Sequence, residues 1–327
     1  MTDYWKDSPT LAARLKRVLA VMDATLDSPS FPIRDSVITA VESKGKLLRP
    51  ALLIIGSSFG HAADPIRIEK LAAAVELLHV ATLVHDDIID EAPIRRGRPS
   101  LHASLGVKEA VLAGDWLFSR CFLLSSESAE PENARGLARL IAAVCSAEIS
   151  QDLEKFQYST SVRRYFRTIA GKTAALFSLA LHAGATEAKA PVRITQSLRR
   201  AGYNIGMAFQ VIDDILDFES VDGLPRKPVG RDIAEGLCTL PLIYALRADR
   251  PGMEALLPRA GHRGEVVSSE VTAAVSALAT KLGGPELARA DARRFTSRAV
   301  AEIGRLPPSP ERDELGRLAE RLLHRAY

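Results

Sequence analysis

The stretch Val84-His85-Asp86-Asp87-Ile88-Ile89-Asp90 places three aspartates at the end of an almost wholly apolar run that begins at Leu71. Residues four apart share one face of a helix, so Asp86 and Asp90 project together, about 6 Å apart along the axis. Asp87 lies at the edge of that face. Three carboxylates within one turn repel one another unless a cation joins them, and Mg²⁺ prefers such oxygen ligands together with waters and substrate phosphates. A solvated acidic patch is the alternative interpretation, but the apolar run indicates a buried helix.

A second acidic turn of the same form occurs later in the chain. Met207–Ile212 is another mostly apolar run, and it leads into Asp213-Asp214-Ile215-Leu216-Asp217, again D-D-x-x-D. Two such clusters argue against chance. Acidic turns that face each other and share Mg²⁺ would make a site for a polyanion, most simply a diphosphate that leaves as negative charge builds up on it.

Composition excludes several other classes of protein. The net charge of +3 is too small for nucleic-acid binding to be the first expectation, and 47% hydrophobic residues are enough for a large core. The three cysteines form no C-x-x-C pair, which is typical of a reducing compartment. The N-terminus has no signal-peptide pattern, and no uncharged run reaches about 20 apolar residues. We therefore expect a cytoplasmic protein with no membrane span, and any membrane contact should be peripheral.

The hydrophobic periodicity predicts helices throughout the chain. The first predicted helix starts at Ser8-Pro9. The next ones cover about 35–43, Pro50 to Gly60, Asp64-Pro65 to Pro93, 107–126, 132–157, 162–184 and 192–219. Shorter helices are predicted in the C-terminal third. No stretch alternates well enough to predict a strand, so residues 95–99 are expected to form a basic loop. Residues 219–239 are rich in Gly and Pro and predict a functional flap. Length alone suggests two domains, but no linker divides the chain, so we predict one all-α domain over residues 1–327.

A diphosphate site also needs cations, and the sequence offers them. Arginine can grip a phosphate with two hydrogen bonds, while lysine supplies a compact charge. Arg95 and Arg96 follow the first acidic turn directly, which makes them the strongest candidates. The other candidates are Lys46, Arg49, Lys172 and Lys227.

These motifs together resemble the trans-isoprenyl diphosphate synthase family. The most specific are L-V-H-D-D-I-I-D-E-x-x-x-R-R-G at 83–97 and G-x-A-F-Q-x-x-D-D-x-x-D at 206–217. The resemblance extends from G-K-L-L-R-P at 45–50 to T-L-P at 239–241. It implies a single all-α bundle of the isoprenoid synthase type, with the two aspartate motifs facing each other across a central cavity. It also implies a homodimer.

The resemblance implies a role for each matching residue. The metal ligands would be Asp86, Asp87, Asp90, Asp213, Asp214 and Asp217, with three Mg²⁺ ions when diphosphate is bound. The residues for isopentenyl diphosphate would be Lys46, Arg49, His79 and Arg96. The residues for the allylic diphosphate would be Arg95, Lys172, Thr173, Gln210 and Lys227. Asp86, Asp90, Asp213 and Lys172 would carry catalysis. In the implied reaction diphosphate leaves the allylic substrate, the double bond of isopentenyl diphosphate attacks the carbocation, and a proton is lost.

One position departs from many relatives. They have a flap lysine just before T-L-P, whereas this chain has Leu237 there. The substitution puts one phosphate contact in doubt and leaves the resemblance to the family intact.

The sequence leaves product length and subunit requirement open. Ala81 and Thr82 are small where short-chain relatives have bulky residues, which favours a product of six or more isoprene units for a quinone side chain. The growing chain is expected to run down an apolar channel beneath the first acidic turn. If Leu78 or Phe122 formed the floor of that channel, the protein would be a short-chain synthase of the geranylgeranyl or farnesyl type. A class I terpene cyclase is the rival enzyme, but its second metal motif usually mixes Asn, Ser and Glu. A catalytic subunit that needs a second chain is also compatible with the sequence.

Overall fold

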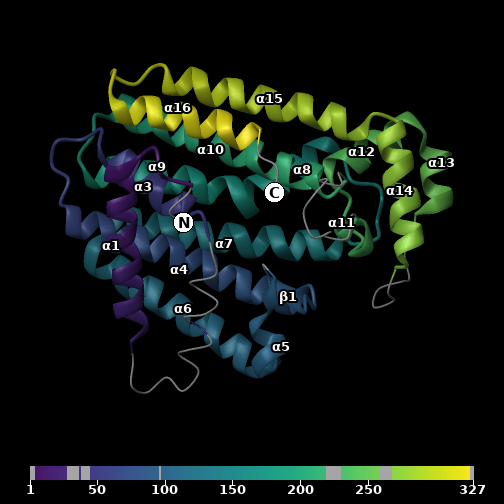
Figure 1. Ribbon diagram of the computed structural model, residues 1–327, viewed down its shortest axis with the longest axis horizontal. Coiled ribbons are helices and arrows are strands. Elements are labelled where there is room, and N and C mark those ends of the chain that lie inside the picture. Colours follow the sequence, from purple (N-terminus) through teal and green to yellow (C-terminus); the bar gives the residue numbers. More distant parts are fainter. Residues whose placement is uncertain are drawn as a thin grey trace. The chain divides into compact units, whose positions relative to one another are not determined.

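The computed structural model describes residues 4–27, 37, 45–95, 97–218, 230–257 and 267–324. Over these residues the chain is almost entirely helical, which confirms the predicted all-α class (Figure 1). Within the described part, no helix is both long enough and apolar enough to cross a membrane. The chain forms two compact units, the first made of Met1–Ala138 and Leu179–Leu198, the second of Arg139–Ser178 and Arg199–Tyr327. The prediction of one domain over residues 1–327 stays a prediction.

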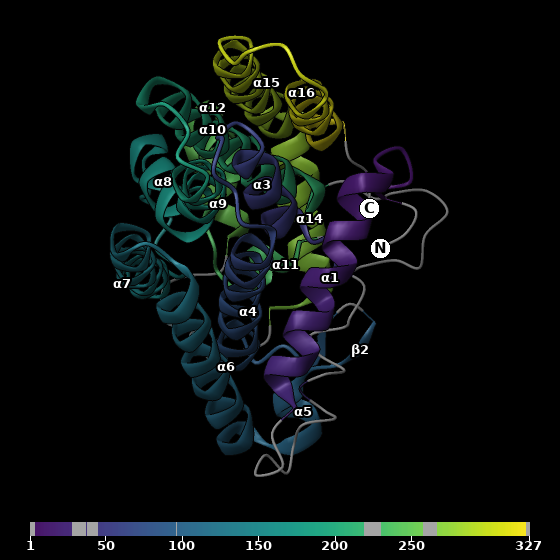
Figure 2. The same ribbon diagram turned by 90° about the vertical axis from the view of Figure 1, so that its left-hand side faces the viewer.

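The first unit is built around one long helix, α4. Its elements are α1 (Pro9–Leu26), α3 (Leu48–Ser57), α4 (Pro65–Ile89), β1 (Ile94–Arg95), β2 (Arg98–Pro99), α5 (Leu101–Leu105), α6 (Val107–Ser128), and parts of α7 (Pro131–Leu153), α9 (Ala175–Glu187) and α10 (Val192–Leu216). Helix α4 packs against α1, α3 and α6, and Figure 2 shows α4 and α6 side by side. Because neighbours cover it on several sides, α4 is apolar around most of its circumference.

Local signals in the sequence fix where α4 begins. The Asp64 side chain accepts a hydrogen bond from Ile66 N at 2.9 Å, and Pro65 occupies the first helical position. Elsewhere in the unit, a Cβ atom on Gly184 of α9 would lie 2.0 Å from the carbonyl oxygen of Leu53 in α3. Only glycine therefore permits this approach of α3 and α9.

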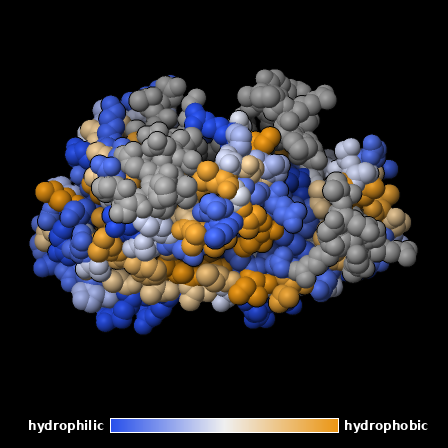
Figure 3. Space-filling model, turned by 90° about the horizontal axis from the view of Figure 1, so that it is seen from below, coloured by the Kyte–Doolittle hydropathy of each residue, from blue (hydrophilic) through white to orange (hydrophobic). Residues whose placement is uncertain are grey.

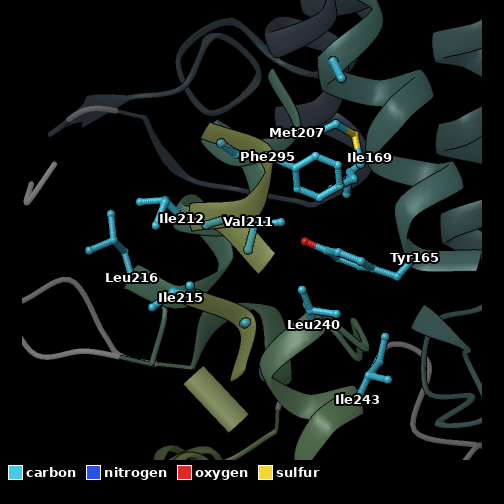
Figure 4. Packing of buried hydrophobic residues seen from close by; sticks show 14 residues of the cluster. Tyr165, Ile169, Met207, Val211, Ile212, Ile215, Leu216, Leu240, Ile243 and Phe295 are labelled. Carbon is cyan, nitrogen blue, oxygen red and sulfur yellow. The ribbon is translucent and has the colours of Figure 1, made fainter. Parts of the chain in front are cut away.

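The second unit contains the rest of α7, α9 and α10 and all the later helices. Its further elements are α8 (Val162–Ile169), the π-helix η1 (Ala170–Ala174), α11 (Arg231–Ala234), α12 (Leu240–Ala248), α13 (Arg250–Leu256), α14 (Ser269–Lys281), α15 (Gly284–Ile303) and α16 (Pro310–Leu323). Helices α15 and α16 pack against each other. A buried apolar cluster joins α8, α10, α12 and α15, and Figure 4 shows its larger side chains.

The structure corrects several predicted boundaries. Ile94–Arg95 and Arg98–Pro99 form the two strands of an antiparallel hairpin where a loop was expected, with Ile94 paired to Pro99. Helix α3 begins at Leu48, which leaves Pro50 in the first turn, where a missing N–H costs no helical hydrogen bond. Helix α4 ends at Ile89, before Pro93, and the helix expected over 162–184 contains the π-turn η1. The short helices α5 and α11 were not predicted. The helix expected over 35–43 lies outside the described residues apart from Val37.

Candidate functional site: two acidic helix ends

The first acidic turn lies at the C-terminal end of α4. Asp90 N still donates to Asp86 O at 2.8 Å, so Asp86 and Asp90 remain one helical turn apart. Both residues are half-buried, while Asp87 is buried. The C-terminal end of a helix carries partial negative charge, so carboxylates are unfavourable there and a cation is favourable. The position of this turn on its helix therefore favours binding of a positive ion.

Asp87 is paired with Arg95. Arg95 Nε and Nη2 donate to Asp87 Oδ1 at 2.8 and 2.6 Å, and the guanidinium comes from strand β1 of the hairpin. Gly97, at φ 77°, forms the turn of the hairpin in the left-handed region that favours glycine. Two residues expected to have separate roles, one in binding metal and one in binding phosphate, thus form an ion pair between a buried carboxylate and a half-buried guanidinium. Arg96 lies outside the described residues.

The three described residues expected to hold isopentenyl diphosphate also lie in the first unit. Lys46 precedes α3, with its amino group 5.1 Å from the centre of the Tyr4 ring, a cation–π distance. Trp5 Nε1 donates to Lys46 O at 2.7 Å and fixes the backbone there. Arg49 lies in the first turn of α3, and His79 lies two turns before Asp86 on α4. Arg49 and His79 are half-buried.

The second acidic turn lies at the C-terminal end of α10, in the second unit. Asp214 is buried, and both of its oxygens accept hydrogen bonds: Oδ2 from Tyr165 Oη at 2.6 Å and Oδ1 from Gln210 Nε2 at 2.8 Å. Burial raises the pKa of Asp214 to about 7, although these two hydrogen bonds act in the opposite direction. Asp213 is half-buried. The carboxylates of this turn lie at the C-terminal end of their helix, as those of the first turn do, and the helix dipole disfavours negative charge there.

Asp217 holds the start of α11. Its two carboxylate oxygens accept hydrogen bonds from Arg231 N at 3.1 Å and Asp232 N at 3.0 Å, and its carbonyl accepts one from Gly230 N at 2.9 Å. Gly230 is in the left-handed region at φ 85°. Burial, and then the charges of Asp217 and its neighbours, raise the pKa of Asp232 well above its usual range. The residue expected to support a metal thus also caps a short helix from outside it, because the N-cap residue, Gly230, has no side chain.

Lys172 and Thr173 lie in the π-helix η1, and π-turns frequently occur at functional sites. Lys172 Nζ donates to Glu148 Oε2 at 2.9 Å and to Gln151 Oε1 at 3.0 Å, both on α7. Thr173 Oγ1 donates to Gln210 Oε1 at 2.6 Å. A continuous hydrogen-bonded chain therefore runs from Thr173 through Gln210 to the second acidic turn.

The flap is only partly described. Lys227 lies outside the described residues. Leu237, at the position of the usual flap lysine, lines a cavity of about 30 Å³ together with polar side chains. The other residues lining it are Gln151, Glu154, Thr160, Tyr165, Thr168 and Cys238.

Sequence reasoning missed Tyr165, Asp232 and the partners of Lys172. Tyr165 precedes Lys172 by seven residues, two helical turns, so a helix over 162–184 would place them near one face. That spacing was the available signal for Tyr165. Glu148 and Gln151 are also within one turn of each other, but nothing in the sequence connects them to Lys172.

The donor set fits a hydrated magnesium ion better than a fully enclosed one. Among the described residues, no three His, Cys, Asp or Glu side chains are already arranged around an ion position. Mg²⁺ usually takes one or two carboxylates and completes its shell with waters and substrate phosphates, which matches paired, half-buried aspartates.

Comparisons with known proteins identify relatives of the whole chain. Residues 32–278 match the polyprenyl synthetase family. The chain is 34% identical to heptaprenyl diphosphate synthase component 2 of Geobacillus stearothermophilus, over 97% of both chains. It is similar to the crystal structure of geranylgeranyl pyrophosphate synthase from Lactobacillus brevis, with a TM-score of 0.91, 32% identity, and coverage of 98% of this chain and 99% of that one. It is also similar to a polyprenyl synthase from Caulobacter crescentus complexed with calcium and isoprenyl diphosphate, with a TM-score of 0.90, 30% identity, and coverage of 99% and 98%.

Proposed function

The chain belongs to the polyprenyl synthetase family, and we propose that it condenses isopentenyl diphosphate with an allylic diphosphate to give a trans-polyprenyl diphosphate. The observation that carries the proposal is the chain of contacts in the second unit. There the acidic turn, Gln210 and Thr173 form one hydrogen-bonded series, next to Lys172 on the same π-turn. A prenyltransferase needs a cation site and a phosphate site side by side, and this series supports such a pairing.

Magnesium is the proposed cofactor, with three ions when diphosphate is bound. The residues that would hold it are Asp86, Asp87, Asp90, Asp213, Asp214 and Asp217. The proposal requires the two acidic turns to serve the same diphosphate. When bound, Mg²⁺ would stabilise the charge that develops on the leaving diphosphate. The calcium in the Caulobacter crescentus complex supports a divalent ion in a related protein.

The protein's own residues would bind and orient the two substrates. Lys172, Thr173, Gln210, Arg95 and Lys227 are proposed for the allylic diphosphate, and Lys46, Arg49, His79 and Arg96 for isopentenyl diphosphate. Asp87 then has a second task, because it fixes the guanidinium of Arg95. The allylic C–O bond breaks, the double bond of isopentenyl diphosphate attacks the cation, and the departing diphosphate takes the proton. Apolar walls would keep water from the cation.

A product of six or more isoprene units, used for a quinone side chain, is the proposed chain length. Ala81, which is buried, and Thr82, which is half-buried, lie on α4. Both side chains are too small to block the channel proposed for the growing chain. Phe122 is 47% exposed on α6, which argues against it as a floor, whereas Leu78 is buried. The heptaprenyl relative supports the longer product, and the geranylgeranyl synthase supports the shorter alternative.

A cytoplasmic homodimer is the proposed assembly. Helix α6 carries several exposed large apolar side chains, and Figure 3 shows apolar surface on the face viewed from below. These side chains are Val107, Val111, Leu112, Phe122 and Leu123. An exposed apolar face suits an interface, and a two-fold interface would bring the same face of both copies together. The relative named as a component supports the alternative, a catalytic chain that requires a second subunit. Sedimentation of the pure chain would distinguish a dimer from a lone monomer.

Incubation of the purified chain with labelled isopentenyl diphosphate, Mg²⁺ and farnesyl diphosphate, followed by sizing of the products, tests the activity. We expect incorporation that ends at six or more units, with Asp213→Ala as the inactive control. Products that stop at four units would overturn the long-chain proposal. Absence of incorporation would overturn elongation by this chain alone, and release of cyclised hydrocarbon would indicate a cyclase.

A further inference from the structure

Tyr165 places a phenol hydroxyl inside the apolar cluster of the second unit. The residue is 5% exposed and comes from α8, and Figure 4 shows its ring extending from the helix with the hydroxyl at the tip, among residues that include Val211 and Leu240. A buried hydroxyl is costly unless it has a hydrogen-bond partner. Its partner is Asp214 Oδ2, at 2.6 Å.

This contact has the length of a hydrogen bond to a charged acceptor, the stronger class. Tyr165 and Gln210 donate to different oxygens of Asp214, Tyr165 to Oδ2 and Gln210 to Oδ1. The carboxylate cannot rotate without losing both bonds. Each oxygen keeps a second lone pair, so the side chain is oriented and still able to accept from a hydrated ion.

We propose that Tyr165 is a positioning residue that fixes Asp214 for the magnesium–diphosphate complex. The inference rests on the proposed function, because it takes the second acidic turn as the metal site. It assigns a role to a residue that touches neither substrate nor metal and acts through Asp214. Outer contacts that orient metal ligands typically change metal affinity or activity 10- to 100-fold when they are removed.

The same unit offers a matched control. Tyr244 on α12 donates to Asp291 Oδ2 on α15, and Arg294 Nη1 also donates to that carboxylate. Tyr244→Phe removes the same kind of hydroxyl–carboxylate contact from the same unit, away from the acidic turns in the sequence. Tyr244 is half-buried whereas Tyr165 is buried. Loss of a hydroxyl–carboxylate contact should lower stability in both variants, whereas a positioning role predicts weaker metal binding in Tyr165→Phe alone.

The test compares Tyr165→Phe and Tyr244→Phe in the full chain. Mn²⁺ binding in the presence of inorganic diphosphate is measured by electron paramagnetic resonance, and the Mg²⁺ concentration for half-maximal rate is measured by product formation. We expect Tyr165→Phe to weaken Mn²⁺ binding and raise the half-activating Mg²⁺ concentration about 10-fold or more. Tyr244→Phe should change both by less than about twofold, and the thermal midpoint should fall in both variants.

A double-mutant cycle with Asp214→Asn shows whether Tyr165 acts through that carboxylate. If it does, Tyr165→Phe should have little further effect on Mn²⁺ binding in the Asp214→Asn background. Equal shifts in the two tyrosine variants, or undiminished Mn²⁺ binding by Tyr165→Phe, would overturn the inference. Loss of the cooperative unfolding transition in Tyr165→Phe alone would overturn it as well, because it would indicate a structural role. A wild-type chain that binds Mn²⁺ with diphosphate but forms no product would contradict the proposed function and leave the inference standing.

Discussion

Replacement of Asp217 by alanine should loosen α11 before it affects anything else in the fold. The carboxylate accepts two backbone N–H groups, those of Arg231 and Asp232, at the start of this four-residue helix. Loss of an N-cap costs roughly 0.5–2 kcal/mol, and two amides held by a charged acceptor favour the upper end, about 2 kcal/mol. Because 1.4 kcal/mol is tenfold in an equilibrium constant, the local opening equilibrium should rise about 30-fold.

Native-state hydrogen exchange measures this opening. The reporting amides are Ala234, Glu235, Gly236 and Leu237, which donate to carbonyls between Gly230 and Ile233. Their exchange should accelerate together in Asp217→Ala, while amides in α15 keep their rates.

Asp249 offers a matched control for this experiment. Its side chain accepts from Gly252 N at 3.0 Å and so caps α13, another short helix of the same unit. Asp249→Ala should accelerate exchange in α13 and leave residues 234–237 unchanged. Unchanged exchange at 234–237 in Asp217→Ala would refute the cap assigned to Asp217.

Two further predictions concern the acidic turns and the cysteines. Asp86→Ala or Asp213→Ala should each abolish product formation while the thermal midpoint stays near that of the wild type, and near-normal turnover in either variant would contradict its assigned role. At pH 8, a thiol reagent should label Cys145, which is exposed on α7. Cys121 is buried and Cys238 is half-buried, and burial raises the pKa values of both thiols to about 12. Mass spectrometry would count the labels, and modification of more than one thiol before unfolding would show that the other two are less protected than their burial implies.

Local sequence signals predicted the helices well. Pro9 and Pro65 start α1 and α4 as expected, and the apolar run before the first acidic turn is indeed buried. These features depend on residues close in sequence: a fixed φ at Pro, a cap at Asp64, and the 3.6-residue period. A single sequence carries that information directly.

The misses depend on contacts between distant residues. The hairpin at 94–99 is stabilised by the pair of Arg95 with Asp87, and its two-residue strands are too short for any alternation to appear. The Tyr165–Asp214 contact spans 49 positions in the chain, and the lysine of η1 finds its partners on α7. Such contacts follow from packing, which spacing alone does not reveal.

Carboxylates at the C-terminal ends of α4 and α10 also carry a consequence for protein engineering. The half-buried Asp86, Asp90 and Asp213 oppose the helix dipole in the free chain, so asparagine at these three positions should stabilise the resting protein. Asp87, Asp214 and Asp217 differ, because their carboxylates hold Arg95, Tyr165 and the start of α11. Selection for thermal stability alone would therefore favour inactive variants, because the positions where the wild-type residue destabilises the fold are those proposed to bind the metal ions.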